Sequence, residues 1–121
     1  MPPLVVVTGA TGKVGTSLID RLVKHGLRIR AIARNAEKLK PLAARGVEVH
    51  AGNLEDTPFL TGAFRGADAV FAVIPDHLDA SDFRETQRQI SASVATSLQT
   101  AGVPRVVLLS SVGADVPSAD Q

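Results

Sequence analysis

Five short apolar runs, separated by segments with helical spacing, constrain the fold of this chain more than any other feature. The runs are rich in Val, Ile and Leu and cover residues 4–7, 29–33, 47–49, 69–74 and 106–109. Such continuous runs are typical of strands buried on both faces of a parallel sheet. Between them, apolar residues recur four or seven positions apart, as Val14, Leu18 and Leu22 do, on one face of a helix. The alternation predicts an α/β fold, a doubly wound parallel sheet of five strands in the order 3-2-1-4-5 with helices on both faces.

Residues that typically end and begin helices stand where this alternation needs them. Glycine often ends a helix in the left-handed conformation, and four glycines stand a few residues before a predicted strand: Gly26, Gly46, Gly66 and Gly102. Candidate N-cap residues for the helices that follow are Asn35, Asp56 or Thr57, and Asp79 or Ser81. The last helix is expected over about residues 83–101, directly before the fifth strand.

Length and composition indicate one folded domain over residues 1–121. Hydrophobic residues make up 45% of the chain and charged residues 21%, which is typical of globular proteins. The formal net charge of +1 creates no broad basic field, so we expect neither nucleic acid nor a membrane surface as a partner. With no cysteine, the chain has no disulfide, thiolate metal site or cysteine nucleophile. The sequence shows no signal peptide and no apolar run of membrane-spanning length, which favours a cytoplasmic location.

The segment from Thr8 to Gly15 resembles a phosphate-binding turn because it joins the first predicted strand to a helix expected to begin near Lys13. In dinucleotide-binding (Rossmann) domains the first glycine makes a tight bend, the second lets the backbone approach the pyrophosphate, and the third lets helix and strand pack closely. The residues proposed to bind the cofactor here are Gly9, Thr11, Gly12, Lys13, Val14 and Gly15. The alternative is a glycine-rich turn that binds nothing.

A nucleoside-triphosphate loop is excluded by its own spacing rules. Gly12-Lys13 resembles the Gly-Lys pair of that loop. The loop also needs a glycine five positions before Gly12 and a serine or threonine after Lys13, where this chain has Val7 and Val14.

The end of the second predicted strand favours NADP(H) over NAD(H). An acidic residue there would accept hydrogen bonds from the ribose hydroxyls of NAD, whereas an arginine suits a 2′-phosphate. The chain places Arg34 there and has no Asp or Glu from Arg21 to Ala36. The alternative is that Arg34 is an ordinary solvated charge at a strand end.

Taken together, these segments resemble the NmrA-like branch of the atypical short-chain dehydrogenase/reductases, over nearly the whole chain. That group includes NADPH-dependent quinone reductases and redox-sensing regulators. The resemblance rests on residues 8–15, 34–35, 51–54, 67–71 and 108–114.

The resemblance implies further cofactor contacts. Asn53 and Leu54, after the third strand, would lie along the adenine. The segment from Ala72 to Pro75, after the fourth strand, would line the ribose and pyrophosphate, with Ala72, Val73 and Ile74 as the named contacts. The family usually has Asp where this chain has Asn53, and an Asn still offers an amide oxygen to the adenine amino group. The alternative for Asn53 is a turn residue that uses its side chain locally.

The catalytic residues are unknown from the sequence. Tyrosine-dependent members of this superfamily use a Tyr-x-x-x-Lys pair as proton donor, and this chain has no tyrosine. Ser110 or Ser111 falls where relatives have a substrate-contacting serine, and His77 is a conceivable proton donor near the ligand-binding edge. The alternative is a solvated loop residue for His77 and a polar strand end for one of the serines, and the dispersed histidines have no metal-ligand spacing.

Members of this family continue well beyond the fifth strand, so we expect a chain truncated relative to the full fold. A fifth strand at the sheet edge, or the helix over 83–101, would then be a surface for a homodimer. The leading hypothesis is the NADPH-binding domain of an oxidoreductase that passes hydride to a quinone-like or other small acceptor. The alternative is a non-catalytic NADP(H) sensor that acts through a protein partner. A sugar-nucleotide epimerase ranks last because it needs the missing tyrosine.

Overall fold

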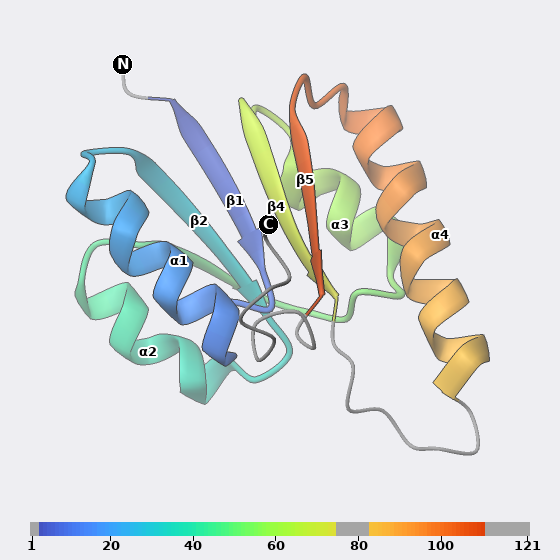
Figure 1. Cartoon of the computed structure of the whole chain (residues 1–121), viewed down its shortest axis with the longest axis horizontal. Coiled ribbons are helices and arrows are strands. Elements are labelled where there is room, and N and C mark those ends of the chain that lie inside the picture. The colour runs from blue at the N-terminus through green and yellow to red at the C-terminus, as the bar shows by residue number, and fades with distance from the viewer. Residues whose placement is uncertain (1–2, 75–82, 111–121) are drawn as a thin grey trace, which may run out of the picture.

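The fold was analysed in a computed structural model that describes residues 3–74 and 83–110, with the side chains of 3–73 and 88–109. Strands and helices alternate along the chain as the sequence predicts (Figure 1). They are β1 (Leu4–Thr8), α1 (Lys13–Lys24), β2 (Arg28–Ala33), α2 (Ala36–Ala44), β3 (Glu48–Ala51), α3 (Thr57–Phe64), β4 (Ala69–Ile74), α4 (Phe83–Ala101) and β5 (Val106–Ser110).

The five strands form one parallel sheet in the order β3-β2-β1-β4-β5. This confirms the predicted doubly wound fold and its strand order. Strands β2 and β3 lie on one side of β1, and β4 and β5 lie on the other, so the direction in which the chain winds reverses at β1. In folds of this kind ligands bind at that reversal, outside the carboxyl ends of the strands.

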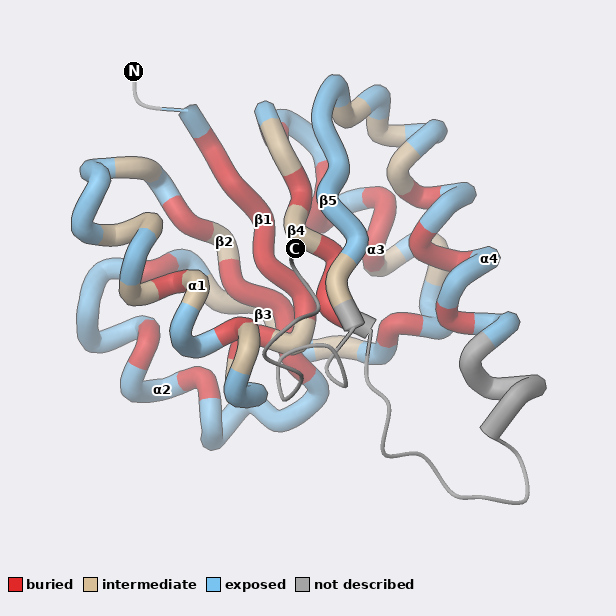
Figure 2. Tube along the Cα trace, viewed as in Figure 1, coloured by how far each residue is buried: buried red, intermediate tan, exposed pale blue. Residues whose placement is uncertain are grey.

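Each face of the sheet packs against its own helix pair, which explains the apolar runs. In β1 successive side chains point to opposite faces: Val6 belongs to the core beneath α3 and α4, and Val5 and Val7 to the core beneath α1 and α2. Figure 2 shows β1 buried along its length between the two layers. Both cores are therefore built around the central strand, and the residue that follows β1 lies where the two halves of the sheet meet.

The predicted helix ends are confirmed wherever the structure describes them. Asn35 caps α2 by accepting hydrogen bonds from two backbone amides, and Asp56 caps α3 by accepting one from the amide of Phe59. The four glycines expected to end helices all have positive φ, between 73° and 87°. The other N-cap candidates, Asp79 and Ser81, lie outside the described residues.

Strand β5 forms one edge of the sheet, as expected from the strand order. Among the described residues it carries the exposed large hydrophobic side chains, which are Val106, Val107 and Leu108, the last 68% exposed. Figure 2 shows this strand pale blue over most of its length. No helix in the described part of the chain is long and apolar enough to cross a membrane.

Candidate functional site

The carboxyl ends of the strands bring the candidate cofactor residues to one edge of the sheet. The parallel register aligns Thr8 with Ile32, Ala33 with Ala51, and Ile74 with Ser110. The residues that follow these strands therefore emerge at the same edge, at the bottom of the sheet in Figure 1. This arrangement gathers the glycine turn, Arg34 and Asn53 from three separate parts of the sequence.

The turn between β1 and α1 is a tight bend held by backbone hydrogen bonds. Gly9 has a φ of 61°, a conformation that favours glycine. The amide of Gly12 donates to the carbonyl of Gly9 at 3.1 Å, and the amide of Ala10 donates to the carbonyl of Ile32 at 3.0 Å. The turn is therefore closed on itself and also attached to the end of β2.

The three glycines of the turn have different surroundings. A Cβ on Gly15 would lie 2.2 Å from the carbonyl oxygen of Gly9, so only glycine permits this approach of helix and turn. A Cβ on Gly12 would have one neighbour within 4 Å, the Gly9 oxygen at 3.5 Å. Gly12 itself is exposed. The geometry agrees with a packing function for Gly15 and leaves open space over Gly12.

Helix α1 begins without the acidic or capping side chains that the next two helices have. Its N-cap is Gly12, no side chain caps it, and its first turn contains no acidic residue. In contrast, Asn35 caps α2 and Asp56 caps α3. The first amides of a helix lack intrahelical acceptors, and the helix dipole makes that end positive. Neither the cap nor the first turn of α1 thus supplies a negative charge to offset this positive potential, and the space over Gly12 beside it suits an anion.

The side chain of Thr8 links β1 to β4 beneath the glycine turn. Its hydroxyl donates to the carbonyl of Val73 at 3.1 Å and accepts from the amide of Val73 at 2.8 Å. The Val73 side chain is buried and would lie 3.3 Å from a Cβ on Gly9. Ala72 is buried too, so these two candidates can border a ligand only through their backbone.

Two exposed cations stand at the end of β2. Arg34 directly follows the strand, and Lys38 lies one turn further on, in the first turn of α2. The intervening acid, Glu37, forms an ion pair with Lys40 at 3.1 Å. No ion pair joins Arg34 or Lys38 to any residue that the structure describes. Positive charge at this corner is therefore not neutralised locally.

Asn53 is exposed and uses its side chain within its own turn. Its side-chain amide oxygen accepts from the backbone amide of Glu55 at 2.9 Å, and its backbone carbonyl accepts from the amide of Asp56 at 3.0 Å. The structure thus shows the local use that the sequence left as the alternative for Asn53. One lone pair of the amide oxygen and the amide NH2 remain for a ligand. The side chain of the neighbouring Leu54 is buried in the core.

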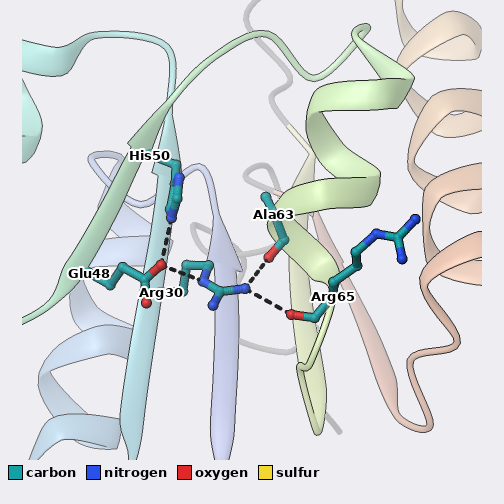
Figure 3. A network of polar contacts seen from close by, with 5 residues as sticks. All are labelled: Arg30, Glu48, His50, Ala63 and Arg65. Carbon is teal, nitrogen blue, oxygen red and sulfur yellow. Dashed lines mark hydrogen bonds and ion pairs between the residues drawn. The ribbon is translucent and has the colours of Figure 1, made fainter.

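A polar network behind this segment attaches α3 to the sheet (Figure 3). The guanidinium of Arg30 donates to the carbonyls of Ala63 and Arg65, at 2.7 and 3.0 Å, where α3 ends. It also pairs with the carboxylate of Glu48 at 2.9 Å, and the same carboxylate oxygen contacts His50 at 2.7 Å. The hydrogen bond from His50, with that from Arg30, lowers the pKa of Glu48 below its ordinary value.

The substrate candidates lie at the limit of the described structure. His77 and Ser111 fall outside the described residues. Ser110 and the cofactor candidate Ile74 end β5 and β4, and their side chains are likewise not described. In the described part of the chain, no group of three or more His, Cys, Asp or Glu side chains could hold a metal ion.

Two features of the site had not been assigned a function from the sequence. The Thr8 hydroxyl bonds to a residue 65 positions away, so no local pattern could have indicated it. Lys38 was detectable, because a lysine four positions after the strand-end arginine falls on the first turn of a helix that the Asn35 cap predicts.

Comparison with known proteins agrees with this geometry. The model of the NmrA-like family matches residues 1–120 of the chain. An NAD(P)H azoreductase from Xenophilus azovorans is 35% identical over 111 residues, which are 92% of this chain and 36% of that protein.

Two solved structures share the fold. A triphenylmethane reductase from Citrobacter sp. in complex with NADP(H) superposes with a TM-score of 0.75 and 32% identity, over 86% of this chain and 36% of that one. A quinone oxidoreductase from Escherichia coli in complex with NADPH has a TM-score of 0.75 and 27% identity, over 86% and 35%. The chain spans about a third of the length of each of these relatives. On the family match and these similarities, the chain belongs to the NmrA-like family.

Proposed function

We propose that this chain binds NADP(H) at the carboxyl edge of its sheet and forms the cofactor-binding part of an oxidoreductase that passes hydride to a quinone-like or other small acceptor. One observation carries the proposal. The glycine turn stands at the reversal of the sheet and leads into a helix whose positive end has no side-chain cap and no acidic residue in its first turn.

The pyrophosphate would lie over Gly12. The space there is open, and amides of the first turn of α1 have no intrahelical acceptor. Two negative charges at this position would interact favourably with the helix dipole. The amide of Gly12 already donates to Gly9, so the amides that follow it in the turn are the donors available to the phosphate oxygens.

The 2′-phosphate of NADP(H) would lie between Arg34 and Lys38. The guanidinium offers a planar pair of donors to phosphate oxygens and the ammonium adds a second positive charge. Glu37, the acid between them in the sequence, pairs with Lys40. NAD(H) has a hydroxyl instead of this phosphate and would gain little from either residue.

The adenine would lie beside Asn53. The amide oxygen of Asn53 has a second lone pair that can accept from the adenine amino group, and the amide NH2 can donate to a ring nitrogen. Leu54 and the buried residues of β4, Ala72 and Val73, would shape the site through their backbone. Ile74, which ends β4, would border the ribose.

The class of hydride acceptor is inferred from the relatives and not from a side chain that the structure describes. The three similar proteins are named for reducing azo compounds, triphenylmethane dyes and quinones. Azo groups, triarylmethyl cations and quinones are conjugated and electron-poor, which suits them to accept hydride. Ser110, Ser111 and His77 are the proposed substrate contacts. A non-catalytic sensor receives no support from these reductases.

Cofactor titration tests the proposal. Fluorescence titration with NADPH and NADH should show binding of NADPH at lower concentration. A Gly12→Val variant should fold and lose binding, because its side chain would occupy the pyrophosphate position. Gly62→Ala is the matched control, since Gly62 lies in α3 with no atom within 4 Å of the added methyl. Following NADPH absorbance with a panel of quinones tests the hydride transfer. Binding by Gly12→Val equal to that of the parent would contradict the placement of the phosphate.

A further inference from the structure

A buried cluster of hydroxyls joins α4 to the first turn of α3, close to the proposed adenine site. The hydroxyl of Thr57 lies 2.9 Å from that of Ser93 in α4. The hydroxyl of Ser97, one turn further along α4, is shared between the carbonyls of Ser93 and Thr57 at 2.7 and 3.2 Å. Ser93 is 6% exposed and Ser97 is fully buried. Two serines of α4 therefore hold one residue of α3.

Thr57, the residue that these serines hold, follows the turn from Gly52 to Asp56, which carries the proposed adenine contacts Asn53 and Leu54. The backbone of Asn53 accepts from the amide of Asp56, and Asp56 in turn caps α3. The other end of this segment is fixed by a hydrogen bond from the amide of Gly52 to the carbonyl of Ala33, at the end of β2. The segment thus has one attachment at the sheet and a second attachment, through Thr57, at α4.

The attachment at α4 lies at the start of α3, four residues after Asn53. Helix α3 is short, from Thr57 to Phe64, and its far end is held by Arg30. Its near end is capped by Asp56, and the hydroxyl cluster gives it a polar contact with α4. Loss of this contact would loosen the polar side of the Asn53 turn, whereas the buried side chains of Leu54 and Leu60 would keep the core folded.

We infer that Ser93 and Ser97 are positioning residues for adenine binding and act through Thr57 on the turn that carries Asn53. The inference rests on the proposed function, because it assigns these serines to the adenine part of that site. Neither serine touches the cofactor. They hold the turn in its binding conformation before the cofactor arrives, which lowers the entropic cost of binding.

The hydroxyl cluster borders a hollow on the protein surface between α3 and α4. This open hollow of about 360 Å³ is lined by Glu55, Thr57, Gln89, Ala92, Ser93 and Thr96. The side chain of Thr57 is only partly buried there, and Ser93 gives its hydroxyl a fixed hydrogen-bond partner.

The test uses the full chain and two ligands that separate the parts of the site. Adenosine 2′,5′-bisphosphate probes the adenine and 2′-phosphate positions, and inorganic pyrophosphate probes the start of α1. The variants are a Ser93→Ala/Ser97→Ala pair from the α4 side, and Thr57→Val from the α3 side. The controls are Thr57→Ser, which keeps the hydroxyl, and Ser91→Ala, which removes an exposed hydroxyl from the same helix.

The inference predicts that the serine pair and Thr57→Val each bind adenosine 2′,5′-bisphosphate about three- to tenfold more weakly in calorimetric titration. Pyrophosphate affinity should stay unchanged, and both controls should bind as the parent does. Combining the α4 and α3 changes should add little to either, because they remove the same interaction. Hydrogen exchange without ligand should be faster at the amides of Glu55 and Asp56 in the serine pair than in Ser91→Ala.

If these hydroxyls only stabilised the fold, the serine pair and Thr57→Val would have lower melting temperatures and would bind adenosine 2′,5′-bisphosphate as the parent does at temperatures where they are folded. Parental affinity for adenosine 2′,5′-bisphosphate in the serine pair, or in Thr57→Val should the pair not fold, overturns the inference. Failure of the parent to bind either this ligand or NADPH is a different result. It overturns the proposed function, and the inference falls with it.

Discussion

The hydroxyl of Thr8 bonds to both the amide and the carbonyl of Val73, at 2.8 and 3.1 Å, although the two residues are 65 positions apart. Backbone pairing between β1 and β4 extends only to Val7 and Phe71. Beyond that pair, the Thr8 side chain continues the link between the two strands by bonding to the backbone of Val73. It therefore holds β4 beneath the glycine turn at the reversal of the sheet.

Thr8→Val should lower the free energy of unfolding by about 1–3 kcal/mol, because the isosteric side chain leaves the buried amide of Val73 without an acceptor. Thr8→Ser keeps the hydroxyl and should recover most of this loss. Urea denaturation measures both, with Thr100→Val on the exposed face of α4 as the control. Equal stability of Thr8→Val and the parent would show that the bond makes no net contribution.

Gly15→Ala should lower the free energy of unfolding by about 1–3 kcal/mol or more, whereas Gly12→Ala should leave it nearly unchanged. The added methyl at Gly15 would meet the backbone of Gly9 and Ala10, which cannot move aside without opening the turn. Thermal denaturation of the two variants without cofactor is the measurement. Similar melting temperatures for the two variants would contradict the assigned packing function of Gly15.

Arg34→Ala should weaken NADPH binding by roughly 1.5–3 kcal/mol and change NADH binding little, since a charge-assisted hydrogen bond to the 2′-phosphate is lost. Lys38→Ala should act in the same direction with a smaller loss. Lys40→Ala is the control because Lys40 pairs with Glu37 and is exposed. Equal losses for NADPH and NADH in Arg34→Ala would exclude recognition of the 2′-phosphate by this residue.

Glu48 should contribute stability at neutral pH that is lost in acid. Its pKa is lowered in the fold, first by the hydrogen bond from His50, so the folded state favours the carboxylate relative to the unfolded chain. The contribution is fully present above the unfolded pKa of about 4.3 and disappears as pH falls through the lower folded value. In Glu48→Gln the free energy of unfolding should therefore decrease less steeply as pH falls from about 5 to 3.

The effect should remain below about 1 kcal/mol because the Glu48 side chain is partly exposed to solvent. Glu37→Gln, in a more exposed ion pair, is the control and should not alter the slope. An unchanged slope in Glu48→Gln would show that the network does not favour the carboxylate.

Two copies of this chain should associate, through β5 or through α4. The edge strand presents exposed Val106, Val107 and Leu108, with no charged side chain from Val106 to Leu109 to oppose pairing. A two-fold axis near Leu108 would place two copies of β5 antiparallel to each other. Light scattering over a dilution series should show a dimer that Leu108→Lys abolishes. Loss in Ala95→Lys instead would assign the contact to α4, and a monomer throughout would contradict both.

The sequence by itself determined the fold and predicted the type of site. The apolar runs and the glycines between them predicted the strand order and helix ends, because strand and helix periodicity are local properties that burial on both faces reinforces. The glycine turn and Arg34 were recognisable for the same reason, since each lies at a fixed offset from a strand that the pattern locates.

Only the tertiary structure decided how the pieces are held and which polar atoms remain free. Ser93 meets Thr57 across 36 positions, and Thr8 meets Val73 across 65. A hydroxyl can bond to any acceptor that packing brings near it, so its partner is not encoded in its own neighbourhood. The sequence allowed two interpretations of Asn53, because its side-chain amide can either bond within its own turn or contact a ligand. In the folded chain one lone pair of the Asn53 amide oxygen accepts from the amide of Glu55 at 2.9 Å, in a local turn.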